Sequence, residues 1–170
     1  MKLIVCDTGP ILHLKEIGLI DLLEKTGRVI IPEVVNSELS ETDPTWREQK
    51  PSWIIIEKLP SSEKFRVDAL CGSALLDIGE AEAISLAQSL KAHWFLTDDA
   101  SARTFADVMG LEVHGTLGIL LWAAAEGYLR HVEARDALKR LSHSSLWISR
   151  AILEEADKAI DKMFEGCPSK

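Results

Sequence analysis

The sequence predicts an α/β fold in which helices cover both faces of a mostly parallel sheet. Through about residue 127, short apolar runs with the length of buried strands alternate with longer segments of helical periodicity. Acidic residues follow several of these runs, at the positions where parallel strands end. With 170 residues and 46% hydrophobic content, the chain is long enough to bury the core of one compact domain.

The first elements are expected in strand–helix alternation. Residues 2–6 favour a buried strand, and residues 8–27 predict one amphipathic helix. Residues 28–31 predict a second strand, and Pro32 is suited to the first turn of the next helix. Residues 40–52 are polar and contain two prolines, so they are expected to form a loop.

The later elements continue the alternation as far as residue 127. In order, we expect a strand at 53–59, helices at 61–76 and 75–92, a strand at 93–97, a helix at 101–110, a strand at 111–115 and a helix at 116–127. Residues 131–144 and 146–166 are helical by pattern and no strand follows residue 114. We therefore predict a domain of residues 1–129 and a helical C-terminal extension of residues 130–170, packed on the same domain or at a dimer interface.

Composition limits the function classes. A formal net charge of −8 argues against binding nucleic acid by bulk electrostatics, so local cations would have to attract such a substrate. The three cysteines lack CxxC spacing, and the five histidines lack metal-ligand spacing and sequence adjacency to the acids described below. No zinc site or disulfide framework is expected. The apolar run near residue 120 is too short to cross a bilayer, so a cytoplasmic protein without a membrane partner is expected.

Acidic residues at the ends of apolar runs carry the chemical prediction: Asp7, Glu38, Glu80 and the pair Asp98 and Asp99. Carboxylates that converge repel one another unless a cation lies between them. Oxygen ligands of this kind suit a hard divalent ion such as Mg²⁺ or Mn²⁺. The pattern therefore indicates phosphodiester chemistry.

Each acid also has a local explanation. Asp7 and the aspartate pair could only cap the helices that follow them, and Glu38 could be a surface residue at a helix end. Glu80 shares a helical face with Ile84, which makes it the preferred ligand on this helix. Glu82 is a weaker candidate, and both glutamates could simply complement the helix dipole.

Five blocks occur in the order DTGPI, PEVVNSEL, GEAEAI, TDDASAR and GTLGIL. This order resembles the PIN domain family, metal-dependent ribonucleases that include the toxins of toxin–antitoxin pairs, and more narrowly a PIN-like branch with these blocks. The resemblance runs from Lys2 to about Leu129. It implies a three-layer α/β/α domain with a mostly parallel central sheet.

The resemblance also implies the site. It assigns the acidic pocket for Mg²⁺ or Mn²⁺ to four positions: Asp7, Glu38, Glu80 and either Asp98 or Asp99, with Asp99 preferred because it lies two residues after Thr97. A similarity of the EAEA segment to flap nucleases keeps Glu82 as a weaker ligand. Thr8 would orient the first acid. Arg103 would touch phosphate, or would be a surface residue paired with Asp99 or Asp107.

The expected activity is metal-dependent endoribonuclease hydrolysis of RNA by the toxin of a toxin–antitoxin pair. A small antitoxin and a homodimer are the expected partners, with Leu121 and Trp122 as interface residues unless they belong to the core. The alternative is a catalytically weak PIN-like module that binds a protein partner. A third option is a Mg²⁺-dependent phosphohydrolase that acts on small phosphate esters.

Overall fold

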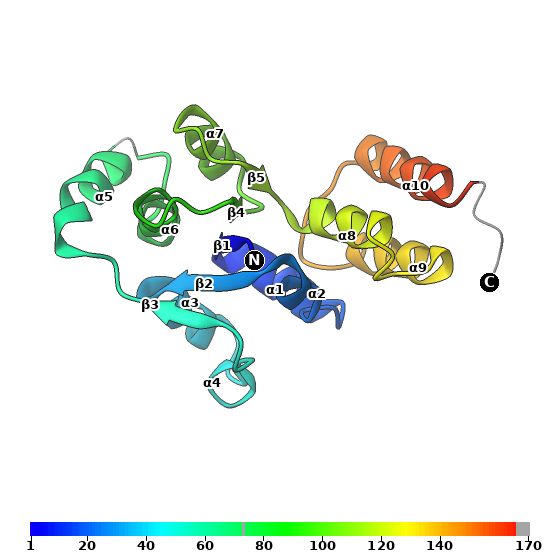
Figure 1. Ribbon diagram of the computed structural model, residues 1–170, viewed down its shortest axis with the longest axis horizontal. Coiled ribbons are helices and arrows are strands. Elements are labelled where there is room, and N and C mark those ends of the chain that lie inside the picture. Colours follow the sequence, from blue (N-terminus) through cyan, green and yellow to red (C-terminus); the bar gives the residue numbers. More distant parts are fainter. Residues whose placement is uncertain (73, 166–170) are drawn as a thin grey trace.

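The computed structural model describes residues 1–72 and 74–165. Its sheet is parallel throughout, with the order β3-β2-β1-β4-β5 (Figure 1). The strands are β1 (Leu3–Cys6), β2 (Arg28–Pro32), β3 (Ile55–Glu57), β4 (Trp94–Leu96) and β5 (Val113–His114). The predicted α/β class is confirmed, and β1 lies at the centre of the sheet.

Helices cover both faces of this sheet. They are α1 (Thr8–Glu16), α2 (Leu22–Thr26), α3 (Glu33–Thr42), α4 (Trp46–Gln49), the 3₁₀ turn η1 (Ser61–Glu63), α5 (Lys64–Cys71), α6 (Ile78–Ser89), α7 (Ala100–Val108), α8 (Thr116–Ala125), α9 (His131–Leu141) and α10 (Arg150–Phe164). Helices α5, α6 and α7 lie on one side of the sheet, and α1, α2, α3 and α8 lie on the other (Figure 1).

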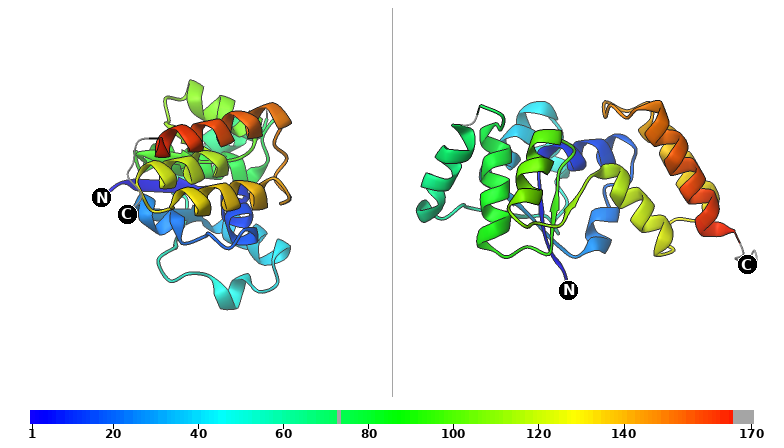
Figure 2. Two further views of the ribbon diagram at one scale, coloured as in Figure 1. Left: turned by 90° about the vertical axis from the view of Figure 1, so that its right-hand side faces the viewer. Right: turned by 90° about the horizontal axis from the view of Figure 1, so that it is seen from above.

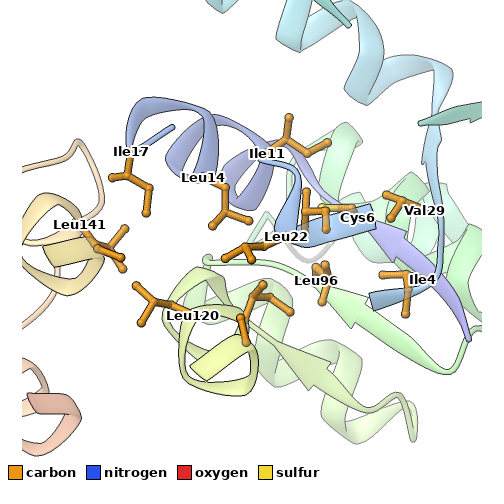
Figure 3. Packing of buried hydrophobic residues seen from close by; sticks show 14 of the residues in the cluster. Ile4, Cys6, Ile11, Leu14, Ile17, Leu22, Val29, Leu96, Leu120 and Leu141 are labelled. Carbon is orange, nitrogen blue, oxygen red and sulfur yellow. The ribbon is translucent and has the colours of Figure 1, made fainter. Parts of the chain in front are cut away.

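Alternation along the strands divides the core into two layers. In β1, Ile4 and Cys6 pack with α1, α2, α3 and α8, whereas Val5 packs with α5, α6 and α7. Figure 3 shows the first layer, in which side chains of α1, α2 and α8 meet those of the central strands. Ile4, Val5 and Cys6, which face both sides of the sheet, are fully buried, which explains the continuous apolar run of β1.

Strand register brings the ends of β1 and β4 to the same edge of the sheet. Cys6 pairs with Leu96, and the next amide, that of Asp7, donates to the carbonyl of Leu96 at 2.9 Å. Crevices that bind ligands in parallel α/β sheets lie at this carboxyl edge. Residues 7 and 97–99 are therefore neighbours despite their separation along the chain.

The C-terminal helices share the core of the sheet domain. Helices α9 and α10 pack on α8 and on each other, at the end of the molecule opposite α5 (Figure 2). Ala137 and Leu141 of α9 and Ala156 and Ile160 of α10 belong to the same apolar cluster as β1. Residues 166–170 of the extension lie outside the described residues.

The single helix predicted for residues 8–27 was wrong, because the chain turns between α1 and α2. Gly18 adopts a φ of +69°, a left-handed conformation that ends a helix at little cost for glycine. The amide of Leu19 then reaches back to the carbonyl of Leu14 at 2.8 Å. Apolar periodicity concealed this turn, because Leu22 and Leu23 on its far side also face the core.

The expected loop at residues 40–52 contains a short helix instead, α4. Burial of Trp46, which is 1% exposed, accounts for it. The indole nitrogen of Trp46 donates to Oδ1 of Asn36 on α3 at 3.0 Å, so the turn is fastened to the domain. A polar composition with two prolines did not reveal this anchor.

Several helix ends also differ from expectation. The helix predicted for 61–76 ends at Cys71, and the one predicted for 146–166 begins only at Arg150, after the Ser149 cap. By contrast, Gly110 and Gly127 follow the ends of α7 and α8, as the sequence predicted, and both adopt left-handed conformations, with φ of +81° and +78°.

No helix in residues 1–72 and 74–165 is both long enough and apolar enough to cross a membrane. The thiols of Cys6 and Cys71 are free, and Cys167 lies outside the described residues.

Replacing Ile160 tests the packing of α10 on the domain. Because this side chain is fully buried, we expect Ile160→Ala to lower the free energy of unfolding by about 2–5 kcal/mol. Ile152→Ala on the same helix, where the side chain is 47% exposed, should cost less than about 1 kcal/mol. Chemical denaturation of both variants provides the measurement. Equal loss of stability would contradict a buried inner face of α10.

Candidate active site

Asp7 follows β1 directly and begins α1. Its side chain is 6% exposed and accepts hydrogen bonds from the amide of Thr8 at 2.8 Å and from the hydroxyl of Thr97 at 3.0 Å. Burial raises the pKa of Asp7 to about 6, although these hydrogen bonds oppose the shift, and the carboxylates of Asp77 and Glu38 raise it further. Hydrogen bonds thus fix the Asp7 carboxylate in a buried position that disfavours its negative charge.

Glu38 reaches the same region from α3. Its Oε2 accepts a hydrogen bond from the hydroxyl of Thr8 at 2.5 Å. Its carboxyl group lies against the backbone of Gly79 in α6, where a Cβ would come within 2.8 Å of the carboxyl carbon. Burial raises the pKa of Glu38, with Asp77 adding to the shift.

Glu80 lies in the first turn of α6, where it forms a capping box with Asp77. The amide of Glu80 donates to Oδ1 of Asp77 at 2.8 Å, and the amide of Asp77 donates to Oε2 of Glu80 at 2.9 Å. Burial raises the pKa of Glu80 to about 7 against the effect of that hydrogen bond, and the charges of Asp77, Asp99 and Asp7 add to the rise. Glu80 therefore lies within electrostatic range of acids from two strand ends.

The two adjacent aspartates have different surroundings. Asp98 accepts hydrogen bonds from the amide and the hydroxyl of Thr116, at 2.7 and 2.6 Å, and its Oδ2 lies 2.7 Å from Nδ1 of His13. Asp99 caps α7 through Oδ1, which accepts from the amide of Ala102 at 2.8 Å. Its Oδ2 makes no hydrogen bond or ion pair with the described residues. Asp98 therefore joins α1, β4 and α8, and Asp99 keeps a free oxygen for a ligand.

One pocket of about 730 Å³ connects these groups. The predicted residues that line it are Asp7, Thr8, Glu38, Glu80, Asp98 and Asp99. They come from the ends of β1 and β4 and from α1, α3 and α6. The structure thus brings these six predicted residues together.

Two predicted residues do not line this pocket. Glu82 lies on the α3 side of α6, where burial raises its pKa and the charges of Glu33 and Glu38 add to the rise. The guanidinium of Arg103 donates to the carbonyl of Thr97 at 3.3 Å and makes no ion pair with any described residue. The alternative in which Arg103 pairs with Asp99 or Asp107 was therefore wrong, and its side chain supports the end of β4.

Sequence reasoning missed two ionisable residues of the pocket, Asp77 and His13. Asp77 was recognised only as a helix start, although the spacing D-x-x-E in residues 77–80 is the pattern of a capping box. His13 lines the pocket and contacts Asp98, whereas sequence adjacency to the acids was the criterion applied to histidines. No local signal could reveal a contact between residues 85 positions apart.

Sequence reasoning also missed the part of the pocket wall that is formed by the connection between α9 and α10. Ser145, Leu146 and Trp147 line the same pocket, although the helical extension was not assigned any part of the site. Helical periodicity does not report where a connection between helices will lie. This wall therefore depends on the packing of α9 and α10 on α8.

The residues present fit a hard divalent cation in ligand type and in charge. The donors are carboxylate oxygens, and none of Asp7, Glu38, Glu80 and Asp99 is paired with a lysine or arginine of the described chain. In this conformation, no group of three or more His, Cys, Asp or Glu residues in the described ranges lies close enough together to hold a metal. In this conformation the Glu38 side chain is hydrogen-bonded to Thr8 and the Glu80 side chain to the Asp77 amide, so a shared ion would compete with these two bonds.

Comparison with known families gives one result. The model of a family described as PIN domain matches residues 3–162, including α9 and most of α10. We found no match to this chain among curated proteins or among solved structures.

Glu80 should make the metal-free protein less stable at alkaline pH. Because the folded state raises its pKa from 4.5 to about 7, its contribution to stability is complete below about pH 4 and is lost as the pH rises through about 7. Glu80→Gln preserves the capping hydrogen bond and removes this titration. We expect the melting temperature to fall more for the wild type than for Glu80→Gln between pH 5 and pH 8 in a chelator. Because the two proteins differ only at residue 80, this difference isolates the Glu80 carboxyl group, and parallel pH profiles would contradict its role.

Because Gly79 has no side chain, the Glu38 carboxyl group can lie against α6 at the pocket. A methyl group in Gly79→Ala would collide with the Glu38 carboxyl group, so we expect Mn²⁺ affinity to fall by about tenfold or more in calorimetric titration. Gly118→Ala is the matched control, because its Cβ meets nothing closer than 3.8 Å in the first turn of α8. Equal Mn²⁺ affinities in the two variants would separate Glu38 from the metal site.

Proposed function

This chain belongs to the PIN domain family, and we propose that it is a Mg²⁺- or Mn²⁺-dependent endoribonuclease that hydrolyses RNA phosphodiester bonds. PIN domains have a nuclease-like fold and typically use divalent metal ions. The proposal extends these family properties to a particular substrate and to particular residues of this chain.

The observation that carries the proposal is an acidic pocket with no lysine or arginine among the described residues that line it. Asp7, Glu38, Glu80 and Asp99 line one cavity at the carboxyl edge of a parallel sheet. Burial raises the pKa of the first three, which means that their charged forms lack adequate compensation. A divalent cation would supply that compensation.

The chain's own residues have distinct roles in this proposal. Asp7 would be the fixed ligand, because hydrogen bonds from Thr8 and Thr97 hold its carboxylate in place. Glu38, Glu80 and Asp99 would complete the set from three other elements. Bound Mg²⁺ or Mn²⁺ would activate water as the nucleophile and offset charge on the phosphodiester. No side-chain nucleophile is needed.

Net charge makes the cation important for substrate binding as well as for chemistry. With a formal charge of −8 and a pocket lined by carboxylates, the metal-free protein should repel a phosphate backbone. Substrate affinity would therefore depend on the divalent ion, and binding of RNA should weaken when the ion is removed.

We also propose the biological setting expected from the family resemblance: a cytoplasmic toxin with a small antitoxin partner, acting as a homodimer. Within one chain, the ring of Trp122 already packs near Trp94 and Tyr128, with centroids 5.7 and 5.5 Å away. Trp122 and Leu121 are partly buried against the core. A dimer interface at this position would therefore be formed by the exposed parts of α8 and of Tyr128.

A catalytically weak PIN-like interaction module is the second candidate. One observation favours it: each acid already has a local hydrogen bond, as a helix cap or to a neighbouring threonine or amide. In this reading, the acidic pocket and the helical extension would form a docking surface for a protein partner. Such a module would bind Mn²⁺ weakly and would not cleave RNA.

Asp7→Asn decides between the two candidates. We expect this variant to lose Mn²⁺-dependent cleavage of a labelled RNA by about a hundredfold or more, because charge stabilisation by a metal is worth several kcal/mol. Its melting temperature should be unchanged or higher, since asparagine still caps α1 and no buried charge remains. Asp107→Asn on the exposed side of α7 is the control and should cleave normally. Equal cleavage by wild type and Asp7→Asn, with no specific heat of Mn²⁺ binding, would contradict the nuclease proposal. The interaction module would then be the remaining candidate.

A further inference from the structure

Trp147 is unusually exposed for a tryptophan. It lies in the connection between α9 and α10, and its side chain is 84% exposed. Trp46 and Trp94 are buried, at 1% and 4% exposed, and Trp53 and Trp122 pack partly buried against the core. A large aromatic surface left in water costs free energy that burial would recover, so covering this ring would be favourable.

Trp147 lies at the acidic pocket. Trp147 lines the same cavity as Asp7, Glu80 and Asp99. Figure 2 shows the connection that carries it beside the end of α1. Although isolated surface tryptophans need no special explanation, this one shares a cavity with the proposed metal ligands.

The backbone on both sides of the ring is held in place. Before it, Ser145 donates from its amide and its hydroxyl to the carboxylate of Glu16, at 2.9 and 2.6 Å. Leu146 and Ile148 pack against the core on either side of Trp147. After it, Ser149 caps α10 by accepting a hydrogen bond from Ile152 at 3.3 Å. The ring is therefore presented by an anchored segment, so little ordering would be needed on binding.

We propose that Trp147 is a stacking platform for an unpaired base of the RNA strand whose phosphate lies in the acidic pocket. This inference rests on the proposed ribonuclease function and adds a residue that selects the substrate. A nucleotide offers a phosphate for the cation site and a flat ring for the indole, and the cavity of about 730 Å³ is within the usual range of about 300–1,000 Å³ for ligand sites.

Stacking on Trp147 would select strandedness rather than sequence. Every base has an aromatic face, so a single indole does not read base identity. Bases inside a duplex already stack on their neighbours and would have to be extruded first. The platform therefore favours loops and single strands. A peptide from a protein partner is the competing occupant, since it could bring cationic side chains to the same carboxylates.

Steady-state cleavage by the whole chain tests the platform. With a labelled single-stranded RNA and Mg²⁺, Trp147→Ala should raise KM by roughly tenfold with little change in kcat, because stacking contributes to binding. Trp147→Phe keeps an aromatic face and should retain most of the affinity. Phe65→Ala is the matched control: Phe65 is also 84% exposed but lies on α5, at the other end of the molecule (Figures 1 and 2).

A second measurement does not depend on activity. In stopped-flow mixing with Mg²⁺, single-stranded RNA should quench tryptophan emission of the wild type, and Trp147→Phe should lose most of that quenching. An oligonucleotide of the same length with abasic nucleotides should bind without this signal, which separates stacking from phosphate attraction. Thermal denaturation checks that the variants remain folded.

The outcomes separate this inference from the proposed function. Cleavage by wild type with an unchanged KM in Trp147→Ala would overturn the platform and leave the ribonuclease. Quenching that depends on Trp147, in a protein that does not cleave RNA, would support the platform and overturn the nuclease. Absence of both cleavage and quenching would overturn both. Loss of binding to a protein partner in Trp147→Ala, with RNA affinity unchanged, would assign the exposed ring to that partner.

Discussion

Pairing of β1 with β4 is the constraint on which the acidic pocket depends. The register that sets Cys6 beside Leu96 brings Asp7 and Thr97 together, and their side chains hydrogen-bond at 3.0 Å. From this edge, α1 leaves with Thr8, which holds Glu38, and α7 leaves with Asp99 as its cap. A slip of one residue in a strand turns every side chain to the other face of the sheet. The apolar sides of β1 and β4 therefore determine the positions of the carboxylates.

The acids have two opposing requirements in this arrangement. Folding needs each carboxylate to have a local partner, and caps and threonine hydroxyls supply these partners. Burial of several carboxylates in one cavity nevertheless raises the pKa of Asp7, Glu38 and Glu80. Cation binding would exchange some local hydrogen bonds for a shared charge. The fold tolerates these unfavourable buried charges because the sheet and the two core layers stabilise the domain elsewhere.

The helical extension takes part in the pocket as well as in the core. Helices α9 and α10 complete the apolar cluster around α8, and the connection between them carries Ser145 and Trp147 to the acidic edge. Bonds from Ser145 to Glu16 at the end of α1 fasten this connection to the sheet domain. The family match across residues 3–162 covers most of this extension too. Stability of the extension and shape of the pocket are thus coupled.

Local sequence patterns were sufficient for the class of fold and for the positions of the acids along the chain. Apolar runs marked β1, β2 and β4, and left-handed glycines marked the ends of α7 and α8. The turn at Gly18 escaped because apolar residues continue beyond it, and α4 escaped because a distant partner, Asn36, anchors Trp46. The contacts of His13 with Asp98 and of Glu38 with Gly79, and the exposed place of Trp147 at the pocket, came only from the folded chain. Periodicity reports the neighbours of a residue within one helix or strand, whereas a pocket is formed where separate elements meet, and packing of the whole core sets those distances.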